Sequence, residues 1–283
     1  MDMKPVLAIL PPKLRESTEG LRTGVLEELR LRAGRPPTAV LDGKECILPG
    51  CAEAVTSRML EEIVSAATNR SCYSAEASLR EGYVTLPGGH RVGLCGTAAL
   101  RESRIQSLRE LSSVSIRIAR QVSCAPPELL RRLDASTLIL GPPGSGKTTL
   151  LRECVRSLSD GGSRVGLVDE RGELAACRLG VPQLDVGAQT DVLTGCGKSE
   201  GIYLLLRAMN PQWIAVDEIT APEDIRAMEE ASYCGVRFLA TAHAFSPDEL
   251  RRRPLYRRLR ELELFQRLLI LSPDKHVTME RMA

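Results

Sequence analysis

Nine consecutive residues of the chain have the types and spacing of a phosphate-binding loop followed by a helix. Residues 141–148 match the pattern G-x-x-x-x-G-K-[ST] at every position, after an apolar segment and before a helical one. The glycines allow backbone N–H groups to turn inward around phosphate oxygens, and a helix N-terminus adds a positive partial charge. In such a loop Lys147 reaches the β- and γ-phosphates and the Thr148 hydroxyl binds Mg²⁺. The pattern therefore predicts binding of ATP with Mg²⁺ by Gly141, Pro142, Pro143, Gly144, Ser145, Gly146, Lys147, Thr148 and Thr149.

Two adjacent carboxylates follow the apolar segment 213–216. We expect Asp217, at the end of this segment, to hold Mg²⁺ directly or through water. Glu218 is then the candidate that orients and deprotonates the attacking water. A base beside the metal suits water activation, so the pair favours hydrolysis over transfer to a small substrate.

Polar residues also follow two other apolar segments. Asp169 and Glu170 end segment 165–168, and His243 follows segment 238–242. Carboxyl ends of parallel strands share one ligand crevice. We therefore expect Asp169 and Glu170 to face the γ-phosphate region and His243 to sense the γ-phosphate. The alternatives are ordinary surface charge for the acids and a packing role for the histidine.

These residues need a scaffold that brings strand ends together. Short apolar segments at 137–140, 165–168, 213–216, 238–241 and 268–271 alternate with helical ones, of which 149–158 follows the phosphate loop. Near-continuous apolar strands separated by helices are typical of a mainly parallel sheet covered on both faces. The sequence thus predicts an α/β P-loop domain over residues 125–283.

Residues 1–124 have a different pattern. Segment 26–32 reads as extended, and apolar residues in 56–67 recur on one helix face, with Thr56 or Ser57 as N-cap. Segments 83–86 and 91–95 flank a Pro-Gly-Gly-His turn and predict a hairpin, and 114–118 alternates as a half-buried strand. These elements predict a small α+β domain, joined to the next by a linker at 125–127.

Composition limits the other function classes. Among 283 residues, Lys plus Arg number 38 and Asp plus Glu 36, a net charge of +2, so nucleic-acid binding requires a local patch. The one basic run comprises Arg251, Arg252, Arg253, Arg257, Arg258 and Arg260. A solvated helix face is the default interpretation, with contact to a partner, a membrane surface or nucleic acid as alternatives. No apolar run is long enough to span a bilayer, so we expect a cytoplasmic protein.

The order of these motifs resembles that of the type II and type IV secretion ATPases, where they are called Walker A, Asp box, Walker B and His box. Nearly the whole chain resembles the stage III sporulation protein AA family of endospore-forming bacteria, with marks at 29–36, 81–84, 88–96 and 115–119. The resemblance implies a RecA-like ATPase that forms a ring, expected to be hexameric. It also implies docking to a membrane-protein component of the channel between mother cell and forespore. The four-cysteine zinc insertion of some secretion ATPases is missing.

The same resemblance implies that arginines of the N-terminal domain reach the nucleotide of their own or a neighbouring subunit. Here the candidates are Arg91, after the Gly88-Gly89 turn, and Arg117. Arg117 alternates with Ile116 and Ile118, so it lies on the opposite face of its strand from them. Ordinary solvated arginines are the alternative.

Two rival functions stay open at this point. A RecA-like core also supports nucleic-acid motors, which salt-dependent binding to DNA or RNA would reveal, although we expect no nucleic acid. The second rival function is a scaffold that binds ATP with little turnover. A comparison of ATP affinity with turnover distinguishes such a scaffold from an ATPase.

Overall fold

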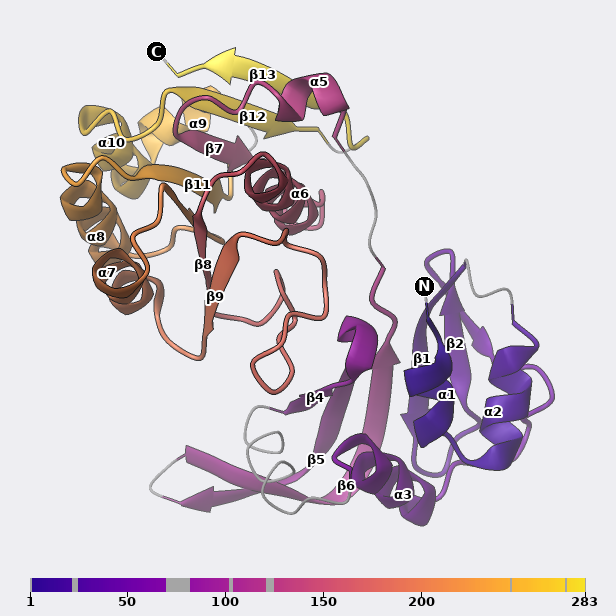
Figure 1. Ribbon diagram of the computed structural model, residues 1–283. Helices are drawn as coiled ribbons and strands as arrows, with labels where there is room; N and C mark the ends of the chain where they lie inside the picture. The colour runs from indigo at the N-terminus through magenta and orange to yellow at the C-terminus, as the bar shows by residue number, and fades with distance from the viewer. Residues whose placement is uncertain are drawn as a thin grey trace. The chain divides into compact units, whose positions relative to one another are not determined.

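The strands of the computed structural model form two sheets, one in each of two compact units, Met1–Arg120 and Gln121–Ala283 (Figure 1). The structure describes residues 2–21, 25–69, 82–101, 104–120, 125–244, 246–272 and 274–282. The expected boundary between 124 and 125 adjoins residues outside this set, and we keep it as a proposal. Glu81, one mark of the family resemblance, also lies outside the described residues.

The first unit is built on a six-stranded antiparallel sheet with the strand order β3-β2-β1-β6-β5-β4. Its elements are α1 (Lys4–Ile9), α2 (Pro12–Glu19), β1 (Leu26–Arg32), β2 (Thr38–Leu41), β3 (Lys44–Ile47), α3 (Ser57–Ala67), β4 (Tyr83–Thr85), η1 (Pro87–Gly89), β5 (Arg91–Arg101) and β6 (Arg104–Arg117). The antiparallel sheet with helices confirms the predicted α+β class for this part of the chain.

Helix α3 forms where the apolar periodicity predicts it. The Thr56 hydroxyl accepts a hydrogen bond from the Met59 N–H at 3.2 Å and so caps the first turn. Leu60, Ile63 and Val64 recur at helical spacing and are buried in the core of this unit.

The predicted hairpin around the Pro-Gly-Gly-His turn is confirmed as β4 and β5, with Val84 opposite Val92. Segment 114–118 was expected as a separate short strand. It is the end of the longer β6, which pairs with β5 out to Arg101 and Arg104. The sequence pattern missed this extension because the distal part of the ribbon is not uniformly buried and so does not alternate clearly.

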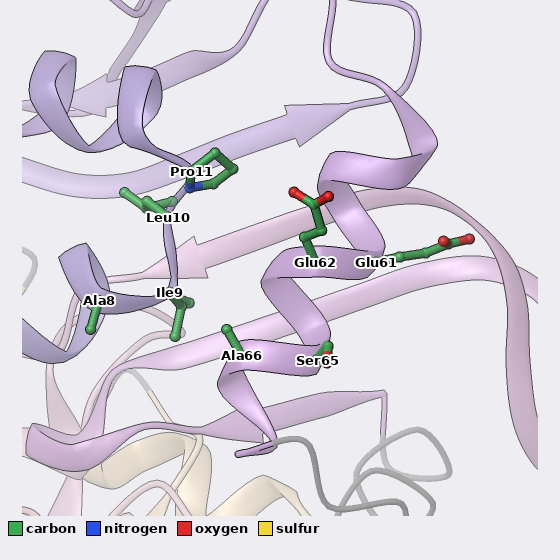
Figure 2. Close-up of a pocket in the computed structure, with 8 residues that line it drawn as sticks. All are labelled: Ala8, Ile9, Leu10, Pro11, Glu61, Glu62, Ser65 and Ala66. Atoms are coloured by element: carbon green, nitrogen blue, oxygen red, sulfur yellow. The ribbon is translucent and has the colours of Figure 1, made fainter.

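A pocket in the first unit lies between α3 and the segment from the end of α1 to the start of α2 (Figure 2). It is lined by Ala8, Ile9, Leu10, Pro11, Glu61, Glu62, Ser65 and Ala66. This lining carries two carboxylates and no basic side chain, so the pocket does not suit a phosphate ligand.

The second unit contains a seven-stranded sheet with the order β13-β12-β7-β11-β10-β8-β9, parallel except for β13. Its strands are β7 (Thr137–Leu140), β8 (Val165–Asp169), β9 (Thr190–Thr194), β10 (Trp213–Val216), β11 (Arg237–Ala242), β12 (Arg267–Leu271) and β13 (Val277–Arg281). Its helices are α5 (Pro127–Leu130), α6 (Lys147–Asp160), α7 (Lys198–Ala208), α8 (Pro222–Ser232), α9 (Pro247–Arg252) and α10 (Pro254–Glu261).

Side chains of alternate residues in the central strands pack in two hydrophobic clusters, one on each face of this sheet. Trp213 and Ala215 of β10 pack in the cluster that contains α6, whereas Ile214 and Val216 pack in the cluster that contains α7, α8 and α10 (Figure 1). Burial on both faces explains why β7, β8 and β10 are apolar at nearly every position. The five predicted strands are confirmed; β9 and β13, both at sheet edges, were not predicted.

Candidate nucleotide site

The candidate phosphate-binding loop, residues 141–146, connects the end of β7 to the start of α6. Gly146 is the N-cap of α6 with φ of +104°, a conformation that side chains disfavour. A Cβ at Gly141 would lie 2.6 Å from Ser145 Oγ and 2.9 Å from the carbonyl oxygen of Leu271. Both glycines are therefore required by this loop geometry.

Two polar groups of the loop fit an anionic ligand. The Ser145 hydroxyl oxygen is buried with no hydrogen-bond partner among the described residues. The Lys147 side chain belongs to a residue only 6% exposed, and burial lowers the pKa of its ammonium, which the Asp217 and Glu218 carboxylates oppose. A phosphate oxygen at the N-terminus of α6 would satisfy both the hydroxyl and the cation.

His243, at the end of β11, connects Lys147 to Glu218. Lys147 Nζ lies 3.0 Å from His243 Nδ1, and His243 Nε2 lies 2.9 Å from Glu218 Oε1. Since an ammonium only donates, Nδ1 is the acceptor, and Nε2 carries the proton that is donated to Glu218. Lys147 Nζ also donates to the Pro142 carbonyl oxygen at 2.9 Å. The imidazole therefore bridges the Lys147 ammonium and the carboxylate of Glu218, the candidate base.

Asp217, after β10, is held between two threonine hydroxyls. Thr148 Oγ1 donates to Asp217 Oδ2 at 2.9 Å, and Thr241 Oγ1 donates to Oδ1 at 2.6 Å. The expected Mg²⁺ ligands, Thr148 and Asp217, therefore lie side by side. No group of three or more His, Cys, Asp or Glu side chains in the described ranges is arranged to hold a metal ion. A magnesium ion here would take its remaining ligands from phosphate oxygens and water.

Glu218 has an unusual backbone conformation, with φ of +52°. Its N–H donates to Thr241 Oγ1 at 2.7 Å, so one hydroxyl fixes both acids. Its Oε2 accepts from Arg171 NH1 at 2.9 Å. A non-glycine residue in the left-handed region is uncommon and concentrates at functional sites. Both oxygens of the Glu218 carboxylate are thereby engaged, one by imidazole and one by guanidinium.

The loop after β8 differs from the sequence-based expectation. Asp169 is 2% exposed, and its carboxylate accepts hydrogen bonds from the N–H groups of Glu173, Leu174 and Ala175 at 2.8–3.1 Å. It therefore anchors its own loop instead of facing the γ-phosphate region. Glu170 pairs with Lys198 at the start of α7, and Lys198 is only 6% exposed. The partner of the Glu170 carboxylate is therefore Lys198, whereas the Glu218 carboxylate contacts His243 and Arg171.

Residues near the α9–α10 junction hold the backbone of His243. The Tyr256 hydroxyl accepts from the His243 N–H at 3.3 Å, and Arg253 NH1 donates to the His243 carbonyl oxygen at 2.8 Å. Burial raises the pKa of Tyr256, which keeps the phenol protonated. From the same basic run, Arg258 pairs with Glu229 and Glu261 at 3.6–3.8 Å. Part of the arginine run is therefore engaged inside this unit.

Arg91 and Arg117 belong to the first unit, where they are directly opposite each other on β5 and β6. The Arg91 guanidinium stacks over the Tyr83 ring at 3.8 Å. Arg117 is exposed, whereas Ile116 and Ile118 are buried. The two candidate arginines are thus cross-strand neighbours in the sheet of the first unit.

Sequence reasoning missed Thr241, Arg171 and Lys198 as members of the site. Thr241 was detectable as a polar residue inside an apolar strand, and Arg171 as a cation directly after the Asp169-Glu170 pair. Lys198 carries no signal of its own, because its meeting with Glu170 depends on how α7 packs beside β8.

A parallel sheet with a phosphate-binding loop after one central strand and a carboxylate after its second neighbour defines this unit as a RecA-like P-loop domain. The family model for sporulation stage III, protein AA matches residues 3–280. The chain belongs to that family.

Two relatives show how far the similarity extends. The chain is 40% identical over 259 residues to stage III sporulation protein AA of Bacillus subtilis (strain 168), covering 88% of this chain and 83% of that protein. It is 28% identical over 278 residues to protein SEEDLING PLASTID DEVELOPMENT 1 of Arabidopsis thaliana, covering 90% of this chain but only 35% of that protein.

Solved structures share the fold at low identity. The pilus retraction motor PilT with bound ADP aligns with a TM-score of 0.64 and 17% identity, over 91% of this chain and 77% of that one. The ATPase DotB of Legionella pneumophila aligns with a TM-score of 0.57 and 17% identity, over 90% and 76%. These likenesses confirm the predicted fold class. Within the described residues, no helix combines the length and apolarity that crossing a membrane requires.

Proposed function

We propose that this protein is an ATPase that hydrolyses ATP to ADP and phosphate with Mg²⁺. The observation that carries the proposal is the continuous set of contacts from Lys147 through His243 to Glu218, beside the Thr148–Asp217 pair. These groups come from the ends of adjacent strands β7, β11 and β10, where ligands of such sheets bind.

Each residue of the set has a chemical role in this proposal. The loop 141–149 binds the phosphates, with Lys147 as the point charge on the β- and γ-phosphates. Thr148 and Asp217 hold Mg²⁺, which neutralises phosphate charge when bound. Glu218 takes a proton from a water whose oxygen bonds to the γ-phosphorus as the bond from that phosphorus to the bridging oxygen of ADP breaks. Glu170 is the alternative base, and His243 senses whether a γ-phosphate is present.

The larger role follows the family. We infer that the chain forms a ring, expected to be hexameric, and uses ATP to power assembly of, or transport through, a channel between mother cell and forespore during sporulation. Family membership and 40% identity to a sporulation protein support this inference. The protein would be cytoplasmic and reach the membrane through a membrane-protein partner. In the ring, Arg91 and Arg117 would supply positive charge to a nucleotide.

Phosphate release by the full chain tests the proposal. Wild type should release phosphate from ATP in a Mg²⁺-dependent manner, and Lys147→Ala should abolish release and weaken nucleotide binding. Lys44→Ala, on exposed strand β3, is the matched control and should behave like wild type. Tight ATP binding without Lys147-dependent release would instead identify a binding scaffold. Salt-dependent binding to DNA or RNA that stimulates release would favour a nucleic-acid motor.

A further inference from the structure

Arg171 places a guanidinium group at the edge of the candidate site from within the same unit. It lies two residues after the end of β8, and its NH1 atom is 2.9 Å from Glu218 Oε2. Glu218 is in turn 2.9 Å from His243, which is 3.0 Å from Lys147. Three short contacts therefore connect Arg171 to the lysine that binds phosphate.

The backbone around Arg171 is fixed, but its side chain has room to move. The Asp169 carboxylate binds three consecutive N–H groups of the loop, and the Gly172 N–H donates to the Asp169 carbonyl oxygen at 3.2 Å. By contrast, the Arg171 side chain is 62% exposed. A long side chain on a fixed backbone can change its partner while the loop keeps its conformation.

The contact of Arg171 with Glu218 is one that the guanidinium can exchange for another acceptor. Ion pairs with an exposed member are weak, because water competes for both charges. A γ-phosphate group carries more negative charge than a carboxylate, and its oxygens accept the planar guanidinium fork well. Exchange would also release Glu218 Oε2, which must accept a proton from water if Glu218 is the base.

We propose that Arg171 supplies, within its own subunit, the guanidinium that meets the charge developing on the γ-phosphoryl group during hydrolysis. The inference deepens the proposed ATPase function and rests on it. It differs from the expectation for Arg91 and Arg117, which belong to the first unit. Arg171 and Glu218 are in contact within one chain. The contribution of Arg171 to hydrolysis is therefore independent of subunit assembly.

Binding of a transition-state mimic tests Arg171 without a measurement of turnover. ADP with aluminium fluoride and Mg²⁺ is the probe, and ADP with Mg²⁺ is the reference ligand. Arg171→Ala should bind ADP like wild type but lose its preference for the fluoroaluminate complex. An arginine that meets transition-state charge also contributes about 10³-fold or more to kcat, so turnover should fall by that order. Arg171→Lys should recover part of both, because it retains a point charge but not the fork.

The exposed residue Arg131 is the matched control, and Arg131→Ala should leave both ligands and turnover unchanged. An Arg171→Ala protein with wild-type preference for the fluoroaluminate complex would overturn the proposal, whatever its turnover. Absence of Lys147-dependent phosphate release in wild type would instead overturn the ATPase function, and the two failures are thereby distinguishable.

Mixing two inactive chains tests whether Arg171 acts within one subunit. Arg171→Ala chains have an intact Lys147, and Lys147→Ala chains have an intact Arg171. If Arg171 serves its own subunit, rings assembled from the mixture should release no more phosphate than the sum of the two variants. Recovery of activity in the mixture would contradict action within one subunit.

Discussion

Nζ of Lys147 lies 3.0 Å from Nδ1 of His243. The same imidazole donates to Glu218 through its other nitrogen, at 2.9 Å. A phosphate that draws Lys147 away therefore removes one of the two partners that fix the imidazole. His243 thus has the geometry to report phosphate binding to Glu218 and, through its backbone, to Arg253 and Tyr256.

His243→Ala should bind ADP normally but lose the difference between ATP-bound and ADP-bound forms. The reason is that the variant keeps Lys147 and the loop but removes the link to Glu218. Protease protection or ring assembly with ATP, a non-hydrolysable analogue and ADP measures this difference. His276→Ala, an exposed histidine, is the control. A variant at 243 that still distinguishes the nucleotides would make His243 a packing residue.

Arg91→Ala and Arg117→Ala should each lower kcat more than ATP affinity, by about 10³-fold or more if the arginine meets transition-state charge. Wild-type specific activity should also rise with protein concentration as rings assemble. If Arg91 or Arg117 acts on a neighbouring subunit, the activity of its alanine variant should recover in mixed rings with Lys147→Ala chains, unlike that of Arg171→Ala. Unchanged kcat in both variants would leave Arg91 and Arg117 as ordinary strand arginines.

Asp169→Asn should destabilise the second unit without removing a catalytic group. The variant replaces a charged acceptor of three backbone N–H groups, and hydrogen bonds to a charged group contribute about 1.5–3 kcal/mol. Urea unfolding followed by fluorescence of Trp213 measures this, since it is the single tryptophan and is buried in β10. An unfolding free energy equal to that of wild type would show that the loop amides find other partners.

Acidification should destabilise the first unit through His90. This residue is 1% exposed; its Nδ1 accepts from the Ala119 N–H at 3.2 Å, and Nε2 donates to the Asp2 carbonyl oxygen at 3.0 Å. Burial lowers the pKa of His90 below its ordinary value of 6.5. The unfolded chain therefore binds the proton first, so stability is full above 6.5 and falls as pH drops through the folded pKa.

Proton NMR titration of the three histidines measures the His90 pKa, with His90→Gln to assign its signal. The same variant should reduce the loss of stability between about pH 7.5 and pH 5.5, the range around an ordinary histidine pKa. A pKa of 6.5 or higher for His90 would contradict this account.

The phosphate loop and the central strands were predictable because their signals are local. The loop is one contiguous motif, and β7, β8 and β10 are apolar at nearly every position since both their faces are covered. Strand β9 lacked such a signal because it is a partly exposed edge strand. Strand β13 runs antiparallel at the opposite edge, with similar partial exposure.

Contacts within the site were harder to predict because they depend on which strands become neighbours. Thr241 meets Asp217 only because β11 pairs with β10 in parallel register. Arg171 meets Glu218 because β8 lies on the other side of β10. Asp169 was placed correctly at a strand end, but burial directed its carboxylate to backbone N–H groups of its own loop.

A comparison of Glu218→Gln with wild type in ATP binding and phosphate release is the strongest test of the proposed hydrolysis. Glutamine keeps the size and the acceptor oxygen but cannot take a proton from water. We expect unchanged Mg²⁺-dependent ATP binding and a kcat lower by about 10²–10⁴-fold, the usual contribution of a general base. A variant with near-normal kcat would contradict the role of Glu218 and move the base to Glu170.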